Sequence, residues 1–407
     1  YKQTEVGIIP EDWNAEPLGI SAKFQGGFAF RSSAFCDIGI PVIRISNVQN
    51  GSVDVDGAIC HPKVSIPPEF IIAEGDALMA MSGATTGKVG VYRHKQFAYQ
   101  NQRVGKFVVK DKKRSSSAFI TQLARSELFL ARLSVFLEQG AQPNISSSQV
   151  ESLVFALPPT KAEQEAIAEA LSDADAHIES LEQFLTKKRQ LKQGAMQELL
   201  RPKSDDETRL LREVSSLKGR IGWQGLKQAE FTPNENEPFL ITGMNFKDGA
   251  IRWGEVYHIS EMRYQMAPEI QLRTADVLMT KDGTIGKVLY IDTIPYPGKA
   301  SLNSHLLLFR PIGAGYHPRY LYYQLGSRRF KDFVELSKSG TTFFGLSQAA
   351  VAAYPALLPP MAKQVRIATI LSDMDAEIAA LEAKLAKARN IKQGMMQELL
   401  TGRIRLV

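Results

Sequence analysis

Apolar residues recur every three or four positions along two segments of this 407-residue chain, residues 164–200 and 364–400. Such spacing gathers the apolar side chains on one face of an α-helix, and alternating steps of four and three form a coiled-coil seam. We therefore expect two helices that pair through this seam. The predicted pairing residues are Ile167, Leu171, Ile178, Leu181 and Leu185 in the first helix and Ile367, Leu371, Ile378, Leu381 and Leu385 in the second.

The two segments are also copies of each other, because 22 of their 37 aligned residues are identical without a gap. Each follows a proline pair, Pro158-Pro159 or Pro359-Pro360, which disfavours helix before it and permits a helix to begin just afterwards. Each is followed closely by a helix-stopping residue, Pro202 or Gly402. The sequence thus predicts two helices of about 40 residues, each roughly 60 Å long.

The seam is disturbed beyond Leu185, where Lys188 and Lys192 occupy positions that an apolar residue would fill. A change of register of this kind locally unwinds a coiled coil. The helices can pair with each other or with a second copy of the chain. Pairing within the chain is favoured, since the second helix can run back antiparallel to the first and bury both seams. A homodimeric coiled coil is the alternative.

The regions before the two helices share an order of elements, although most of their surface residues differ. Each contains a strand-like run that ends in a turn dipeptide, Asn50-Gly51 or Asp248-Gly249, which favours a tight hairpin. The stretch "GDALMAMSGATTGKVGVY" from residue 75 parallels "ADVLMTKDGTIGKVLYI" from residue 275. Helical stretches are expected around residues 118–138 and 319–337. The chain is therefore interpreted as one unit that occurs twice.

These patterns predict an α+β protein with a pseudo-two-fold internal repeat. Two mixed α/β domains, residues 1–157 and 204–357, are separated by two long antiparallel helices that form a coiled-coil spacer. The helices lie in residues 158–203 and 358–407. The two cysteines suit a reducing cytoplasm, and the absence of a long uncharged apolar run argues against a membrane. A net charge of +6 is compatible with a nucleic-acid partner and equally with an ordinary basic surface.

Signatures of catalysis are missing from the sequence. The stretch "SGATTGKV" is no phosphate-binding loop, because three residues separate Gly83 from Gly87 and Val89 follows Lys88. A turn between two strands is the better interpretation. The chain also lacks the Asn/Asp-Pro-Pro-aromatic loop that an amino-methyltransferase needs, and its six histidines are scattered without metal-ligand spacing. We therefore predict no catalytic residue and no metal ligand, which favours a binding and scaffolding protein.

Along its whole length the chain resembles the specificity subunit of type I restriction–modification enzymes. The two "LPP…KQGxMQELL" helices look like that family's two conserved regions, and the segments around "GDALM" and "GKV" look like the core of its target-recognition domains. The resemblance implies that each mixed domain reads one half of a bipartite site in double-stranded DNA. It implies that the helices set the length of the DNA spacer between the two half-sites and dock two methyltransferase subunits.

The same resemblance implies further partners and a location. Restriction subunits would complete the complex, in the cytoplasm and without a membrane. S-adenosylmethionine, ATP and Mg would be used by the partner subunits, and this chain would hold no cofactor. The alternative function is that of a self-assembling structural coiled-coil protein without DNA specificity.

Candidate DNA contacts follow from the chemistry of base recognition. Arg can form two hydrogen bonds with guanine, and Asn or Gln can do so with adenine. The stretch "YQNQR" from residue 99 is rich in such side chains, and nearby Lys and Arg residues could contact phosphates. The predicted DNA-binding residues are Thr85, Lys88, Arg93, Gln100, Asn101, Gln102, Arg103, Gln142 and Asn144 in the first half, and Lys281, Thr284, Lys287, Asn303, Ser304, His305, Thr341 and Thr342 in the second.

Overall fold

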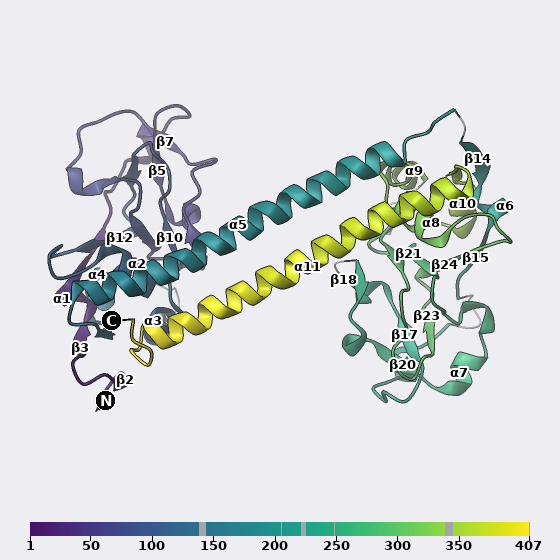
Figure 1. The fold of residues 1–407 in the computed structure, drawn as a ribbon. Helices are drawn as coiled ribbons and strands as arrows, with labels where there is room; N and C mark the ends of the chain where they lie inside the picture. Colours follow the sequence, from purple (N-terminus) through teal and green to yellow (C-terminus); the bar gives the residue numbers. More distant parts are fainter. Residues whose placement is uncertain (138–143, 205, 221–224, 248, 338–344, 407) are drawn as a thin grey trace. The chain divides into compact units, whose positions relative to one another are not determined.

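The computed structural model describes residues 1–137, 144–204, 206–220, 225–247, 249–337 and 345–406. The chain divides into two compact units (Figure 1). Unit 1 comprises Tyr1–Glu182 together with Ala383–Val407, and unit 2 comprises Gln183–Glu382. Each unit therefore contains one mixed domain and one half of each long helix. No helix in the described part of the chain is long and apolar enough to cross a membrane.

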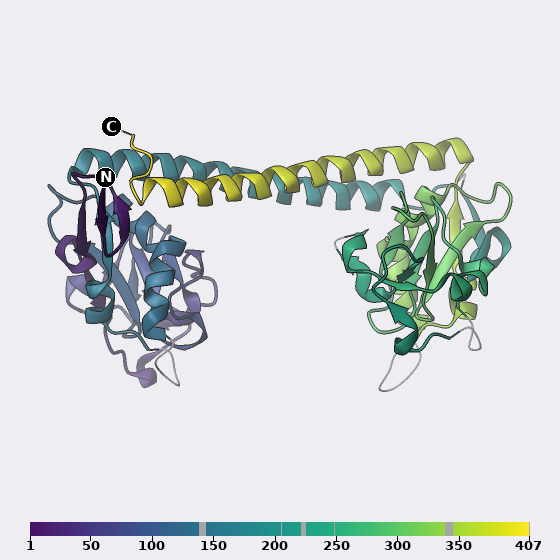
Figure 2. The same cartoon turned by 90° about the horizontal axis from the view of Figure 1, so that it is seen from below.

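The two predicted long helices are present as α5 (Lys161–Leu199) and α11 (Met361–Leu399). They lie side by side and run in opposite directions (Figures 1 and 2). Each begins within two residues of its proline pair, as the sequence predicts. The repeated glutamine near each start, Gln164 or Gln364, is buried. Its side-chain oxygen accepts the backbone N–H of Ser116 or His317, at 2.9 Å in both units, and so caps a helix of the adjoining domain.

The domain of unit 1 is built around a five-stranded sheet and a four-stranded sheet. The first has the order β4 (Ala22–Gly26), β12 (Val104–Val109), β9 (Ala77–Ala80), β10 (Val89–Val91), β6 (Gly51–Ser52). The second has the order β7 (Cys60–His61), β5 (Ile40–Ile43), β11 (Ala98–Gln100), β8 (Ile71–Ile72). A short pair, β13 (Val154–Leu157) and β3 (Asn14–Pro17), precedes α5. The helices are α2 (Ser117–Ala124), α3 (Glu127–Leu137) and α4 (Ser147–Ser152).

The domain of unit 2 repeats this plan with two four-stranded sheets. The first has the order β15 (Ser215–Lys218), β24 (Leu306–Pro311), β21 (Val277–Thr280), β22 (Val288–Tyr290). The second has the order β16 (Phe231–Thr232), β20 (Tyr257–Ile259), β17 (Phe239–Ile241), β23 (Ala300–Leu302). A short pair, β14 (Glu207–Leu210) and β25 (Pro355–Leu358), precedes α11. The helices α8 (Pro318–Leu325), α9 (Arg328–Ser337) and α10 (Gln348–Ala352) correspond to α2, α3 and α4.

Tight hairpins lie where they are predicted, across Asn50-Gly51 in unit 1 and at Gly249 in unit 2. The backbone N–H of Gln49 bonds to the carbonyl of Ser52, at 3.0 Å, across Asn50-Gly51. In unit 2, β18 (Phe246–Lys247) pairs with β19 (Ala250–Ile251) on either side of the second dipeptide. Gly51 and Gly249 have φ of 89° and 79°, which glycine adopts without a steric penalty. The "SGATTGKV" stretch also joins two antiparallel strands, β9 and β10, as expected.

The two helical stretches predicted around residues 118–138 and 319–337 are each broken into two helices. The break lies at a serine, Ser126 or Ser327, whose hydroxyl donates to the carbonyl three residues earlier, at 2.6 Å in both units. The same oxygen accepts the N–H of Phe129 or Phe330, so it starts the next helix as an N-cap. The predicted helical stretches are therefore present, and the capping serine divides each of them although the apolar pattern continues across it.

The ends of the predicted seam belong to the domain cores. Ile167 and Leu171 are fully buried in one cluster with Phe119, Leu123 and Leu400 of unit 1. The equivalents in unit 2, Ile367 and Leu371, lie in a cluster with Leu200, Tyr320 and Tyr323. Among the other predicted pairing residues, Leu181, Leu185 and Leu385 are buried, whereas Ile178, Ile378 and Leu381 are half-buried. Each helix is thus anchored to a domain at its N-terminal end.

Ion pairs between the helices fill the stretch where the apolar seam is interrupted. In unit 2, Lys192 pairs with Asp375, and the Nζ of Lys188 lies 2.6 Å from the Oε2 of Glu377. In unit 1, the Nζ of Lys392 lies 2.6 Å from the Oδ1 of Asp175. A second repeated set joins Arg189 to Glu382 and Arg389 to Glu182, at 2.6 and 2.5 Å. The lysines that disturb the heptad pattern are therefore partnered by carboxylates of the facing helix.

Candidate nucleic-acid interface

Three loop segments that are far apart in sequence meet beside the end of β9 in unit 1. The N–H of Met81 bonds to the carbonyl of Arg103 at 3.0 Å, and the N–H of Ile145 bonds to the carbonyl of Met81 at 2.9 Å. Ser82 and Asn144 form an isolated β-bridge. The Arg103 guanidinium donates to the Oδ1 of Asn144 at 2.8 Å. Arg103 and Asn144, predicted separately from the sequence, are thus in contact. We call this meeting point the loop junction.

Unit 2 has a loop junction with the same backbone connections. The N–H of Lys281 bonds to the carbonyl of His305, and the N–H of Leu346 bonds to the carbonyl of Lys281, both at 2.9 Å. Asp282 and Gly345 form the matching isolated bridge. The side chains differ, because here the Nδ1 of His305 lies 3.1 Å from the Oδ2 of Asp282. The repeat therefore preserves a backbone frame and varies the polar groups that the frame presents.

A short 3₁₀ segment that is not among the predicted residues contacts the loop junction of unit 1, and unit 2 has a matching segment. In unit 1 this is η2 (Ile45–Asn47), whose Ile45 carbonyl accepts the Thr85 hydroxyl at 3.1 Å. Just beyond it, Gln49 accepts from the Nζ of Lys88 at 3.2 Å. In unit 2 the matching segment is η7 (Gly243–Asn245), whose Met244 is 77% exposed. A signal was present in the sequence, since "RISNVQN" places polar residues directly after an apolar strand.

The remaining predicted residues at the junctions differ in exposure. Gln102, Thr284, Lys287 and Ser304 are exposed, while Asn101, Lys281 and Asn303 are half-buried. The Oδ1 of Asn303 accepts the N–H of His305 at 3.1 Å, which shapes the turn. Gln142, Thr341 and Thr342 lie outside the described residues. They adjoin Asn144 and Gly345 in sequence, which are themselves junction residues.

Two predicted residues have structural partners instead. Gln100 is fully buried, and its side-chain amide donates to the carbonyls of Gln25 and Val104, at 2.8 Å each. A residue without exposed surface cannot reach a ligand, so Gln100 is corrected to a structural role. Arg93 forms an ion pair of 2.6 Å with Glu179 on α5. This contact ties the strand end to the long helix, and the Arg93 side chain stays 48% exposed.

The junction chemistry matches the recognition of base edges. Arg103 offers two parallel N–H donors, Asn144 offers a donor and an acceptor, and Asp282 offers acceptors only. These three patterns suit guanine, adenine and the cytosine amino group, respectively. Within the described ranges, no group of three or more His, Cys, Asp or Glu residues could hold a metal ion.

Comparison with known proteins gives matches in both halves of the chain. A family model described as the type I restriction modification DNA specificity domain matches residues 10–193 and again 207–389. The MjaVIII specificity subunit of Methanocaldococcus jannaschii is 31% identical over 185 residues, which cover 44% of this chain and 43% of that relative. The EcoKI specificity subunit of Escherichia coli is 22% identical over 435 residues, which cover 98% of this chain and 90% of the relative.

The fold itself also matches a solved structure. The crystal structure of the S subunit of a type I restriction–modification system from M. genitalium superposes with a TM-score of 0.63 at 16% identity. The match covers 98% of each chain.

Proposed function

The chain belongs to the family of type I restriction–modification specificity subunits, and we propose that each of its units reads one half of a bipartite DNA site. Members of this family are the non-catalytic DNA-recognition subunits of a larger complex. The observation that carries the proposal is the pair of loop junctions. They share their backbone hydrogen bonds but present different polar side chains, as expected of two readers with different target sequences.

In this proposal the exposed and half-buried polar residues of the junctions contact the base edges. Arg103 and Asn144 would act in unit 1, and Asn303, Ser304 and His305 in unit 2. Lys88, Lys281 and Lys287 would contact phosphates, which contribute affinity and register but no direct sequence information. Thr85, Gln102 and Thr284 lie on the same loops.

We assign the partners by the repeated helix surface. A face that occurs twice in one chain suits a partner that is present in two copies, which in this family would be the methyltransferase subunit. Restriction subunits would complete the complex. S-adenosylmethionine, ATP and Mg would be used by those partners. The low cysteine content of the chain, two residues, supports a cytoplasmic site of action.

The direct test is sequencing of methylated adenines in host cells with and without the gene. We expect the wild-type host to carry methylation at a split motif, two short half-sites around a fixed spacer, and the deletion strain to lose it. Reintroduction of the gene should restore the same motif. Unchanged methylation in the deletion strain would contradict the proposal. A self-assembling coiled-coil protein, the alternative function, would leave methylation unaffected.

A further inference from the structure

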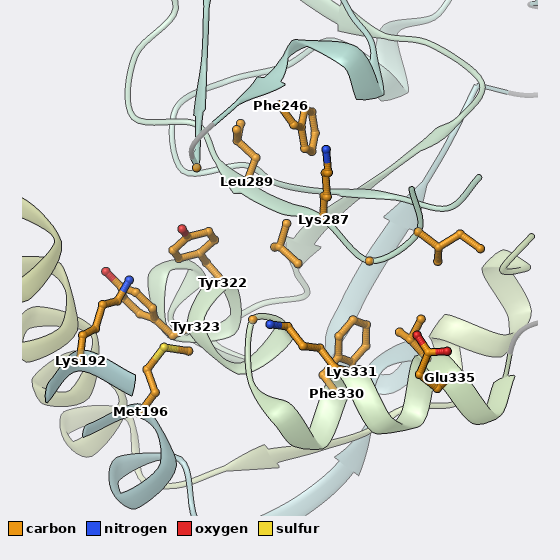
Figure 3. Close-up of a pocket in the computed structure, with 16 residues that line it drawn as sticks. Lys192, Met196, Phe246, Lys287, Leu289, Tyr322, Tyr323, Phe330, Lys331 and Glu335 are labelled. Atoms are coloured by element: carbon orange, nitrogen blue, oxygen red, sulfur yellow. The ribbon is translucent and has the colours of Figure 1, made fainter. Parts of the chain in front are cut away.

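Two adjoining hollows of about 710 and 660 Å³ lie in unit 2, where α9 faces the second half of α5. Both are lined by Lys192 and Met196 of α5 and by Lys331 of α9. The first hollow extends to Lys287, on the turn between β21 and β22 (Figure 3). The second extends to Arg201, just beyond α5. We call the two hollows together the basic groove.

The second hollow carries an excess of positive charge on its wall. Six cationic side chains line it and no carboxylate does: Arg189, Lys192, Arg201, Arg328, Arg329 and Lys331. Arg189 and Lys192 are neutralised by Glu382 and Asp375, and the Nε of Arg328 lies 3.8 Å from the Oδ2 of Asp332. Among the described residues, Arg201, Lys287 and Lys331 enter no ion pair. The first hollow is lined by one carboxylate, Glu335. Cations that lack a paired carboxylate repel one another, and an anionic ligand would relieve this repulsion.

Arg329 supplies a separate observation. Its Nη1 atom is buried and has no hydrogen-bond partner in the described part of the chain. The guanidinium is 5.8 Å from the ring centroid of Tyr354, which packs against the carbon of the group and satisfies none of its N–H donors. A buried donor without an acceptor costs about 1–3 kcal/mol, and more for a charged group. Arg329 itself lines the second hollow, so its guanidinium adds to the positive charge there.

Unit 1 shows that the repeated fold does not require these charges. Counted from the capping serines Ser126 and Ser327, the positions of Arg329 and Lys331 are held in α3 by Leu128 and Leu130. Arg328 is replaced by Glu127. The corresponding hollow of unit 1 is lined by Glu127 and by four cations, Arg125, Arg389, Lys392 and Arg403. Each of these cations forms an ion pair with a carboxylate, so the excess of unpaired cations is found in unit 2.

We propose that the basic groove binds the phosphate backbone of the DNA duplex held by unit 2. The proposal rests on the proposed function. Lys287 connects the groove with the loop junction of unit 2. It lies on the turn that belongs to the junction, and it also lines the first hollow with Lys331 (Figure 3). The groove thus extends the interface of unit 2 beyond the base-reading loops. It adds affinity without sequence preference, and unit 1 has no matching contribution.

The test uses the double variant R329L/K331L, which gives α9 the residues that α3 carries. The intact complex is purified from the host, and its affinity is measured between low and moderate salt. One duplex carries the methylated motif of the host and another a scrambled sequence. The slope of log K against log salt is negative. Each lost phosphate contact reduces its magnitude by about 0.9, so the loss of two contacts reduces it by about 1.8. We expect this change for both duplexes, with their affinity ratio unchanged.

Matched variants make the result specific. K112L/K113L removes two exposed lysines from a surface turn of unit 1 and should leave the slope unchanged. K331L alone changes only an exposed residue and should reduce the magnitude of the slope by about 0.9. This variant shows whether the effect persists when Arg329, whose replacement could disturb folding, is kept.

Two outcomes would overturn the inference. The first is a slope that R329L/K331L leaves unchanged, although the wild-type complex discriminates the two duplexes. The second is loss of the methyltransferase subunits from the variant complex at an unchanged slope, which would assign the groove to an acidic protein surface. Failure of the wild-type complex to discriminate the duplexes would instead overturn the proposed function, on which the inference rests.

Discussion

At the scale of single residues, the two units differ mainly in what their shared backbone frame presents. Met81 and Lys281 make the same pair of backbone hydrogen bonds, yet they bring together Arg103 with Asn144 in one unit and Asp282 with His305 in the other. Side chains held in this way are partly ordered before DNA binds. Less conformational entropy is lost on binding, and a wrong base leaves a polar group without a partner.

Substitution of Arg103 by alanine should therefore weaken discrimination at a single base pair of the first half-site. A good pair of hydrogen bonds to one base contributes about 1–3 kcal/mol of discrimination, so we expect a loss of that size at one position only. Affinities of the purified complex for a set of duplexes with single base-pair changes provide the measurement. K112A, at an exposed position of a surface turn in the same unit, is the control. A uniform loss of affinity across all duplexes would assign Arg103 to phosphate binding.

Asp175 of α5 is a second residue with a predictable effect. Burial opposes its ionisation, but hydrogen bonds from Arg125 and Lys392 outweigh burial, and the pKa of Asp175 lies below its ordinary value. The side chains of Asp175, Arg125 and Lys392 are only 17%, 13% and 12% exposed. Replacement by asparagine would leave two cations without their carboxylate. We expect D175N to lower the free energy of unfolding by about 2–4 kcal/mol at neutral pH.

The pH dependence of this effect has a defined sign. Because the folded-state pKa of Asp175 is lower than the unfolded value of about 3.9, the unfolded chain takes up the proton first on acidification. The stabilisation is complete above that pH and is lost as the pH falls further. Denaturant unfolding at several pH values should thus show wild type and D175N converging below about pH 4. D173N, at an exposed position of the same helix, should follow wild type throughout.

At the scale of elements, the sequence was most informative where structure depends on neighbours in the chain. The bounds of α5 and α11 follow from the proline pairs, and the hairpins follow from Asn50-Gly51 and Asp248-Gly249. The sequence was less informative where a residue finds its partner far away. The Asp375 that accompanies Lys192 is 183 positions along the chain, and Gln100 bonds to the carbonyl of a residue 75 positions away. No local sequence pattern indicates such contacts. Lys192 was therefore interpreted as an interruption of the apolar seam, and Gln100 as an accessible DNA contact.

The long helices lead to a prediction about the DNA spacer. Every inter-helix ion pair named above joins residues of one unit. Four residues inserted after Thr186 and after Ala386 together would therefore lengthen both helices without breaking these pairs. One helical turn adds about 5.4 Å and one base pair occupies about 3.4 Å. We expect the spacer of the methylated motif to lengthen by one or two base pairs while the half-sites stay the same.

Sequencing of methylated adenines in the insertion strain measures this effect. Insertion in α5 alone is the control, because it shifts one helix past the other and should abolish methylation. An active double-insertion strain with the original spacer would show that the helices do not set the distance.

At the scale of the whole molecule, each unit holds its own core, its own loop junction and its own inter-helix ion pairs. The two readers should therefore be exchangeable one at a time. Replacement of residues 1–157 by the corresponding domain of a relative should change one half of the methylated motif and preserve the other half and the spacer. The buried contacts of Gln164 with Ser116 and Pro158 define the joint that the exchange must keep. Simultaneous change of both half-sites would show that the domains do not read independently.

Unit 2 is also one uninterrupted stretch of chain, bordered on both sides by the repeated helix sequence. In the gene, the coding region of this reader is therefore flanked by two related stretches. Homologous recombination acts on such flanks, so a crossover between related genes can replace a complete reader as a cassette. The inter-helix pairs Lys192–Asp375 and Arg189–Glu382 have counterparts in Lys392–Asp175 and Arg389–Glu182, so these pairs would survive the exchange. A lineage can in this way acquire a new restriction specificity in one genetic event, without evolving a new subunit interface.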